Sequence, residues 1–193
     1  MVYLIVMASG ASKRFGENKL LYSFNGKKLY RYLIDELVTL TKYQIIVVTS
    51  YEEIKKEVED RMVVVLNCES EKGITSSIHL GIQTARQRED SVDNIYVFFT
   101  ADQPFLNAQL IEDFIEQFKQ SPYGLGCLAS GKNLGNPGIF RQKYVEELLK
   151  LQGDKGGKSI IKQNKEDGFF YPVQKEVLID IDTKEILRQL EEE

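Results

Sequence analysis

Residues 2–19 read VYLIVMASGASKRFGENK. The apolar run from Val2 to Ala8, which ends at small residues, predicts a buried strand. Directly behind it come small residues, two glycines and three cations, Lys13, Arg14 and Lys19. Backbone N–H groups in such a loop can approach an anion closely, and the cations neutralise charge that the amides cannot. The stretch therefore predicts a strand followed by a phosphate-binding loop.

Two familiar phosphate motifs do not fit this loop. A P-loop has four residues between its glycines and then Lys-Ser/Thr, but five residues separate Gly10 from Gly16, which Glu17 follows. Ser12 stands where a dinucleotide fingerprint has its second glycine. The later segment 153–159, GDKGGKS, is one residue short of a P-loop and follows a helical stretch. We therefore predict that the first loop binds phosphate by another motif. The alternative interpretation is a surface turn with solvated lysines.

Apolar periodicity over the rest of the chain predicts alternating strands and helices. Buried strands are expected at 2–8, 44–49, 62–66 and 95–100, and amphipathic helices at 29–40, 51–59 and 74–88. Helices are also expected at 107–119, 143–151 and 184–190, and short strands at 125–129, 138–140, 169–173 and 177–181. This order predicts a doubly wound α/β fold with a mostly parallel sheet and antiparallel edge strands in the C-terminal half.

Carboxylates follow two of the expected strands. Asp102 ends a very apolar strand, and Asp180 and Asp182 alternate at the end of another, which would send both side chains to one face. Mg²⁺ in proteins takes one or two carboxylates together with substrate phosphates. Asp102 with a partner such as Asp182 is therefore a candidate magnesium site, while capping of a turn by Asp102 and of a helix by Asp182 are the structural alternatives.

Composition narrows the class of protein further. The chain has 193 residues and a net charge of -4, without a basic block, which argues against a nucleic-acid partner. The first apolar run is too short for a signal peptide or membrane span, so we expect a cytoplasmic protein that forms one domain over residues 1–193. Cys68 and Cys127 lack metal-site spacing and are expected to be buried thiols, and the lone His79 is expected to be a helix surface or packing residue.

Six segments in order resemble one family nearly from end to end. They are the opening Ala8 to Lys19, the Asn67 stretch leading into residues 73–77 (GITSS), residues 101–104 (ADQP), 135–140 (GNPGIF), 153–158 (GDKGGK) and 180–183 (DIDT). The set resembles the MobA-like nucleotidyltransferases of molybdenum cofactor maturation, above all the molybdenum cofactor cytidylyltransferases and the accessory proteins of molybdenum hydroxylases. The resemblance implies a GT-A-like fold, a nucleoside triphosphate on the first loop, and Mg²⁺ held by Asp102 with help from Asp182.

The resemblance also implies roles for single residues. Catalysis would rest on Arg14, Lys19 and Asp102, and the nucleotide would contact Ala8, Ser9, Gly10, Ala11, Ser12, Arg14, Lys19, Asn67, Ser77 and Asp102. The pterin would face Gly135, Asn136, Pro137, Asp154 and Lys158. The implied reaction is transfer of CMP from CTP to the phosphate of molybdopterin, or of its molybdenum form, with release of pyrophosphate.

Two positions depart from the family pattern. Ser9 stands where Ala or Gly is common, and Lys28 replaces a frequent Pro. Because the Ser9 hydroxyl adds bulk and a donor that a guanine-selecting Gly lacks, CTP is preferred over GTP as the substrate. The alternatives are a guanylyltransferase, a nucleotidyltransferase acting on a sugar or polyol phosphate, and a non-catalytic carrier of the cofactor to a molybdenum hydroxylase.

Overall fold

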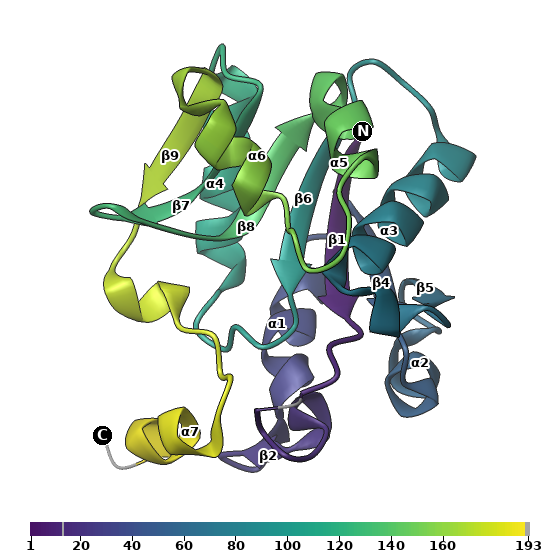
Figure 1. Cartoon of the computed structure of the whole chain (residues 1–193), viewed down its shortest axis with the longest axis vertical. Helices are drawn as coiled ribbons and strands as arrows, with labels where there is room; N and C mark the ends of the chain where they lie inside the picture. Colours follow the sequence, from purple (N-terminus) through teal and green to yellow (C-terminus); the bar gives the residue numbers. More distant parts are fainter. Residues whose placement is uncertain (13, 192–193) are drawn as a thin grey trace.

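The computed structural model describes residues 1–12 and 14–191, so Lys13 of the first loop lies outside the described residues. A seven-stranded sheet of order β5-β4-β1-β6-β8-β7-β9 runs through the molecule, with helices on both of its faces (Figure 1). Its strands are β1 (Val2–Ala8), β4 (Gln44–Thr49), β5 (Val63–Leu66), β6 (Ile95–Thr100), β7 (Leu125–Ser130), β8 (Asn133–Arg141) and β9 (Gly168–Pro172). A separate two-stranded ribbon pairs β2 (Ser23–Phe24) with β3 (Lys27–Lys28).

The helices follow most of the predicted periodic stretches. They are α1 (Leu29–Val38), α2 (Glu52–Val58), α3 (Ile74–Arg88), α4 (Ala108–Gln120), α5 (Val145–Leu149), α6 (Lys158–Gln163) and α7 (Lys184–Glu191). Short 3₁₀ turns lie at η1 (Lys19–Leu21), η2 (Ser70–Lys72), η3 (Gln142–Tyr144), η4 (Lys165–Asp167) and η5 (Lys175–Leu178). The Asn107 side chain accepts a hydrogen bond from the Leu110 N–H at 2.9 Å, so Asn107 is the N-terminal cap of α4, the helix expected at 107–119.

Strand pairing confirms the mostly parallel α/β sheet. Strand β1 pairs in parallel with β4 and β6, and β4 pairs in parallel with β5. The expected antiparallel pairing occurs in the C-terminal half, but at a different place in the sheet. Strand β8 runs antiparallel to both of its neighbours, β6 and β7, and is therefore interior, while the edge strand β9 is parallel to β7.

Alternation along the strands divides the apolar side chains between two cores. Leu4 and Val6 of β1 face one side of the sheet, where α1, α2 and α4 pack, and Tyr3 and Ile5 face the other, where α3, α5 and α6 pack. Because the carboxyl ends of the parallel strands β1, β4 and β6 meet at one edge, the segments that follow them are brought together there.

The expected strand at 177–181 is wrong. Its first residues belong to η5, and the backbone beyond them joins the rest of the fold through the Ile181 N–H, which donates to the Asp102 carbonyl at 3.0 Å. Ile181 and Leu187 of α7 are buried in a third apolar cluster with Phe15 and Leu29. Packing against the first loop, rather than sheet pairing, therefore fixes this segment and brings Asp182 to the sheet edge.

The structure confirms some of the expectations for single residues and contradicts others. Cys127 is buried as expected, but Cys68 is exposed because it lies in the turn after β5. The ring of His79 packs from α3 toward α5, with its Nε2 3.1 Å from the Leu148 carbonyl oxygen. The residues 153–157 connect helix α5 to α6, and α6 itself was not predicted. Within the described part of the chain, none of the helices is long and apolar enough to cross a membrane.

Candidate active site

The first loop leaves β1 at the carboxyl edge of the sheet and folds around Ser12. The Ser12 carbonyl accepts from the N–H groups of Phe15 and Gly16, and Ser12 and Gly16 have positive φ angles of 49° and 84°. The Ser12 hydroxyl accepts from the Lys19 N–H at 3.2 Å and donates to the Gly10 carbonyl at 3.4 Å. Ser12 thus closes the loop and fixes the start of η1, from which the Lys19 side chain extends.

Strand β4 holds the loop from the other side. The Thr49 hydroxyl donates to the Ala8 carbonyl at 2.9 Å, and the Tyr51 hydroxyl donates to the Gly10 carbonyl at 2.6 Å. Ser9 is buried, and its hydroxyl donates to the Val48 carbonyl at 3.1 Å. The donor that the sequence analysis assigned to base selection is therefore used within the protein.

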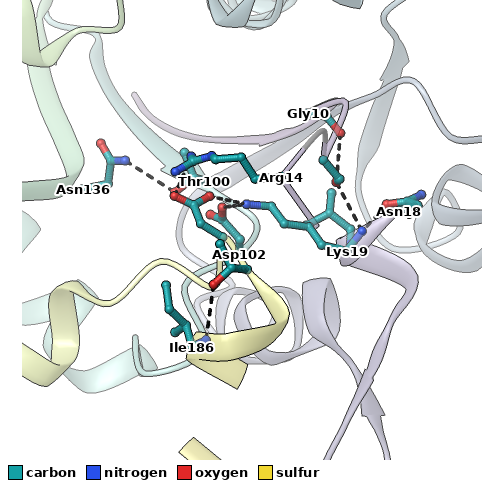
Figure 2. Close-up of polar contacts among 12 residues, drawn as sticks. Gly10, Arg14, Asn18, Lys19, Thr100, Asp102, Asn136 and Ile186 are labelled. Carbon is teal, nitrogen blue, oxygen red and sulfur yellow. Dashed lines mark hydrogen bonds and ion pairs between the residues drawn. The ribbon is translucent and has the colours of Figure 1, made fainter. Parts of the chain in front are cut away.

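Two cations of the loop meet two carboxylates from distant parts of the chain (Figure 2). The Lys19 Nζ lies 2.5 Å from Asp102 Oδ2 and 2.8 Å from Asp182 Oδ1. A guanidinium nitrogen of Arg14 lies 2.8 Å from Asp182 Oδ2. At the start of α7 the Thr183 hydroxyl accepts from the Ile186 N–H, so Thr183 rather than Asp182 caps this helix among the described residues.

The ion pairs differ in exposure and so in strength. The Lys19 side chain is 10% exposed, whereas the Arg14 side chain is 72% exposed. Burial lowers the pKa of Lys19, but the charges and hydrogen bonds of Asp102 and Asp182 outweigh it and hold this pKa above its ordinary value. Burial likewise raises the pKa of Asp182, and Lys19 and Arg14 outweigh it and hold it below its ordinary value. These groups are therefore ionised at neutral pH.

Asp180 is a third carboxylate beside this cluster. Burial, followed by the charges of Asp102 and Asp182, raises its pKa from the ordinary 3.8 to about 6. Its Oδ1 atom is buried without a hydrogen-bond partner among the described residues. The charged form of Asp180 is therefore disfavoured by the fold.

Replacement of this group should stabilise the protein. In the folded state Asp180 keeps its proton up to a higher pH than in the unfolded chain, so stability is lost as pH rises from about 4 to about 6. At pH 7.5 the variant Asp180→Asn should therefore raise the free energy of unfolding by about 1–3 kcal/mol, and this gain should shrink as the pH is lowered toward 4. Urea unfolding at both pH values measures it. Asp182→Asn should have the opposite sign, and a destabilised Asp180→Asn would contradict this view.

A cavity of about 530 Å³ opens beside the cluster. Many of the predicted site residues line it together: Ser9, Gly10, Ala11, Ser12, Arg14, Lys19, Ser77, Asp102 and Asp154. Its wall includes Gly73, which has a φ of 90°, and a Cβ there would fall 2.5 Å from the Gly153 carbonyl. The Gly153 carbonyl accepts from the N–H and the hydroxyl of Thr75 at 3.2 and 2.9 Å. The segment 153–154 is thus held against the start of α3, on the border of the cavity.

Other predicted site residues lie elsewhere. Asn67 is buried and donates to the hydroxyls of Ser76 and Ser77 at 2.8 and 3.0 Å, so it supports the start of α3 and lines a second cavity of about 410 Å³. Ala8 is buried at the end of β1. Neither cavity is lined by Gly135, Asn136, Pro137 or Lys158. Asn136 donates to the Thr100 hydroxyl at 3.4 Å at the neighbouring end of β6.

Several residues that shape the site were not among the candidates predicted from the sequence. Ser70, Glu71, Ile74 and Thr100 line the main cavity, and Tyr51 holds the loop. Two of them could have been predicted from their position in the chain. Glu71 lies in the segment that follows β5, and Thr100 is the last residue of β6. The hydroxyl of Tyr51 could not have been predicted, because its hydrogen bond to Gly10 spans 41 residues.

The donor set fits a divalent metal that arrives with phosphates. Asp102 Oδ1 is buried and has no hydrogen-bond partner among the described residues, while Asp102 Oδ2 and Asp182 Oδ1 already hold a cation, the Lys19 ammonium. Over the same described residues, no group of three or more His, Cys, Asp or Glu is arranged to hold a metal. Two carboxylates completed by phosphate oxygens are what Mg²⁺ prefers, rather than a closed protein cage.

A loop of small residues at the carboxyl edge of a parallel sheet, joined there to cations and carboxylates, defines an α/β protein that handles nucleotides. The family model described as the MobA-like NTP transferase domain matches residues 4–168. The chain belongs to this family of nucleotidyltransferases.

Curated relatives support the assignment. The chain is 33% identical over 152 residues to a protein of Pyrococcus horikoshii, and the match covers 78% of this chain and 72% of that protein. It is 29% identical over 156 residues to a protein of Thermococcus sibiricus, covering 79% and 74%. Both relatives are named probable molybdenum cofactor guanylyltransferase.

Solved structures share the fold at low identity. Rv0371c of Mycobacterium tuberculosis H37Rv superposes with a TM-score of 0.80 at 20% identity, covering 100% of this chain and 98% of that one. The 2-C-methyl-D-erythritol 4-phosphate cytidylyltransferase of Francisella tularensis gives 0.75 at 19% identity, covering 98% of each chain. These similarities confirm the GT-A-like fold expected from the sequence.

Proposed function

We propose that this protein transfers the nucleotidyl group of CTP to the phosphate of molybdopterin, or of its molybdenum form, and releases pyrophosphate. The observation that carries the proposal is the meeting of Arg14 and Lys19 with Asp102 and Asp182 at one cavity of about 530 Å³. Cations suited to phosphates and carboxylates suited to a metal are the two requirements of phosphoryl-group transfer. The proposal takes residues 1–193 as one domain, since Asp182 comes from the C-terminal segment.

The chemistry needs little from the protein beyond position and charge. A phosphate oxygen of the acceptor attacks the α-phosphorus, the bond from that phosphorus to the bridging oxygen breaks, and pyrophosphate leaves with the electron pair. The attacking phosphate is already ionised at neutral pH, so no general base is required. Arg14 would bind the β- and γ-phosphates, and Lys19 would neutralise charge that develops near the α-phosphate.

Asp102 and Asp182 would hold Mg²⁺. When bound, the metal would polarise the phosphates and neutralise part of their charge. Burial, followed by the charges of Asp102 and Asp182, raises the pKa of Asp180, and the proposal does not include Asp180 as a ligand. The pterin would lie toward Asp154 on the cavity wall. Of the other proposed pterin residues, Gly135, Asn136, Pro137 and Lys158, Asn136 is joined to that wall by its hydrogen bond to the Thr100 hydroxyl.

The choice of CTP rests on the motif resemblance, which extends to the C-terminal residues 180–183 that bring Asp182 into the site. The hydroxyl argument for Ser9 is weaker than expected, because that hydroxyl donates to Val48, and only the size of the side chain still favours a pyrimidine. GTP is the second candidate, favoured by the names of the archaeal relatives. Asn67 and Ser77 would act near the base or ribose, Ser77 from the cavity wall and Asn67 by holding it.

The test is a mass spectrum of the product formed from molybdopterin, Mg²⁺ and an equimolar mixture of the four nucleoside triphosphates. We expect the cytosine dinucleotide of molybdopterin and one pyrophosphate for each product formed. If the guanine dinucleotide predominates, GTP rather than CTP is the substrate. Binding of molybdopterin without any pyrophosphate release would instead indicate a non-catalytic carrier for a molybdenum hydroxylase.

Removal of the Arg14 side chain should weaken nucleotide binding. Arg14 is exposed and its partner Asp182 has a second cation, so Arg14→Ala should leave the fold intact. Loss of a charged hydrogen-bonding group should weaken CTP binding by about 1.5–3 kcal/mol, roughly 10- to 150-fold. Titration calorimetry with CTP and Mg²⁺ measures the change, with the surface variant Arg31→Ala as the control. Unchanged affinity would remove Arg14 from the site.

A further inference from the structure

The Lys19 ammonium lies at the centre of the acidic cluster. It lies between Asp102 Oδ2 and Asp182 Oδ1, at 2.5 and 2.8 Å, and both Lys19 and Asp102 are buried. These two oxygens belong to the carboxylates proposed to hold the metal. A buried ammonium beside them and a divalent cation repel each other, so both cannot use the same oxygens at full strength.

Each of the two cations in the cluster is already paired with a carboxylate. Lys19 and Arg14 supply two positive charges, and Asp102 and Asp182 supply two negative charges. A nucleoside triphosphate alone would have to attract cations that are already paired, and a metal alone would have to bind beside the buried Lys19 ammonium or displace it from the oxygens that it holds. Arrival of both together satisfies both sets, because the phosphates can take the cations while the metal takes the carboxylates.

We propose that Lys19 is an internal counter-ion that keeps divalent metal out of the nucleotide-free site and moves to the phosphates when metal and nucleotide enter together. This inference rests on the proposed function, since it uses the same site. It assigns Lys19 two successive partners, the carboxylates and then the phosphates, and it couples metal binding to nucleotide binding. Arg14 acts in the same sense on Asp182, but more weakly because it is exposed.

The test measures metal binding without nucleotide. Mn²⁺ is titrated into the full-length protein and free Mn²⁺ is followed by electron paramagnetic resonance. Lys19→Met should bind Mn²⁺ at least about tenfold more tightly than the native protein, because a full positive charge is removed from beside the ligand oxygens. Adding Asp102→Asn to this variant should abolish the gain, which assigns it to this site.

The chain offers a matched control at its surface. The Lys28 ammonium also lies between two carboxylates, 2.6 Å from Glu53 and 2.5 Å from Glu57, but its side chain is 34% exposed. Lys28→Met removes the same charge and frees two carboxylates in solvent, so it should leave the affinity for Mn²⁺ close to that of the native protein. A gain in Lys28→Met equal to that in Lys19→Met would mean that net charge alone is responsible, and would overturn the inference.

A second variant covers the case in which Lys19→Met does not fold. Lys19→Gln removes the charge but keeps an amide donor for the carboxylates, and it should show the same tighter binding. Unchanged or weaker Mn²⁺ binding in whichever folded variant is obtained would overturn the counter-ion role. Product formation by the native protein is assayed separately, so failure of the proposed transfer reaction and failure of this inference give different results.

Discussion

Asp102→Asn is expected to lose turnover by at least about a thousandfold while keeping the fold, because the amide cannot replace a charged ligand of the metal. The substitution keeps the size of the side chain and an oxygen that can accept from Lys19. The hydrogen bond from the Ile181 N–H to the carbonyl of residue 102 is kept, because it involves only the backbone. The measurement is the rate of pyrophosphate release at saturating CTP, molybdopterin and Mg²⁺.

The matched control for this prediction is Asp35→Asn. Asp35 pairs with Lys27 and Arg31 on the surface of α1, away from the cavity lining, so its loss should leave the rate near that of the native protein. Circular dichroism checks the fold of both variants. Near-native pyrophosphate release by Asp102→Asn at ordinary magnesium concentrations would rule out Asp102 as the principal ligand.

Lys19→Met is expected to lower kcat/KM by about 100- to 10,000-fold, because a preorganised buried charge beside the reacting phosphorus is removed. The same variant is expected to bind free Mn²⁺ more tightly, so loss of activity would accompany a gain in metal affinity. A residue that only supported the fold would lower both. Lys19→Arg should recover part of the rate, because it keeps the charge in a different geometry.

Stability must be checked for this variant, because it leaves Asp102 and Asp182 with fewer partners. We expect some loss of thermal stability, and kinetics are therefore measured well below the unfolding temperature of the variant. Lys28→Met serves again as the control, with native activity expected. A Lys19→Met variant that is folded and retains more than about a tenth of native kcat/KM would contradict the assignment of Lys19 to charge stabilisation.

The parts of the fold that could be predicted are those fixed by local periodicity. The apolar face of α3 repeats at helical spacing, β1 is an unbroken apolar run, and Asn107 is a strong helix cap, so each was found from its own residues. The sequence also placed Lys19 and Asp102 at the same edge of the sheet, because segments behind parallel strands converge there, but it did not predict their ion pair. A local sequence pattern was sufficient to predict the elements that depend on neighbouring residues and the sheet edge that depends on the order of the strands.

The remainder depends on contacts between distant segments. Val177 to Ile181 alternates like a strand, but Leu178 packs against Gly135 and Ile181 against the first loop, so tertiary packing overrides the pattern. Asn67 has the polarity of a ligand contact, and only the fold turns its amide toward Ser76 and Ser77. The acceptor of the Ser9 hydroxyl, the Val48 carbonyl, lies 39 residues away in the sequence. No local pattern therefore indicated that this hydroxyl is used within the protein rather than for the nucleotide.

The central claim is that one cavity binds the triphosphate on the first loop and the metal on Asp102 and Asp182. A crystal grown with Mn²⁺ and the α,β-methylene analogue of CTP tests it most directly, because the anomalous signal of manganese locates the metal. We expect one strong peak bound by Asp102 and Asp182, with the triphosphate along residues 8–19 and the Lys19 ammonium moved onto a phosphate. Manganese or nucleotide bound elsewhere, such as in the second cavity beside Asn67 and His79, would contradict the account.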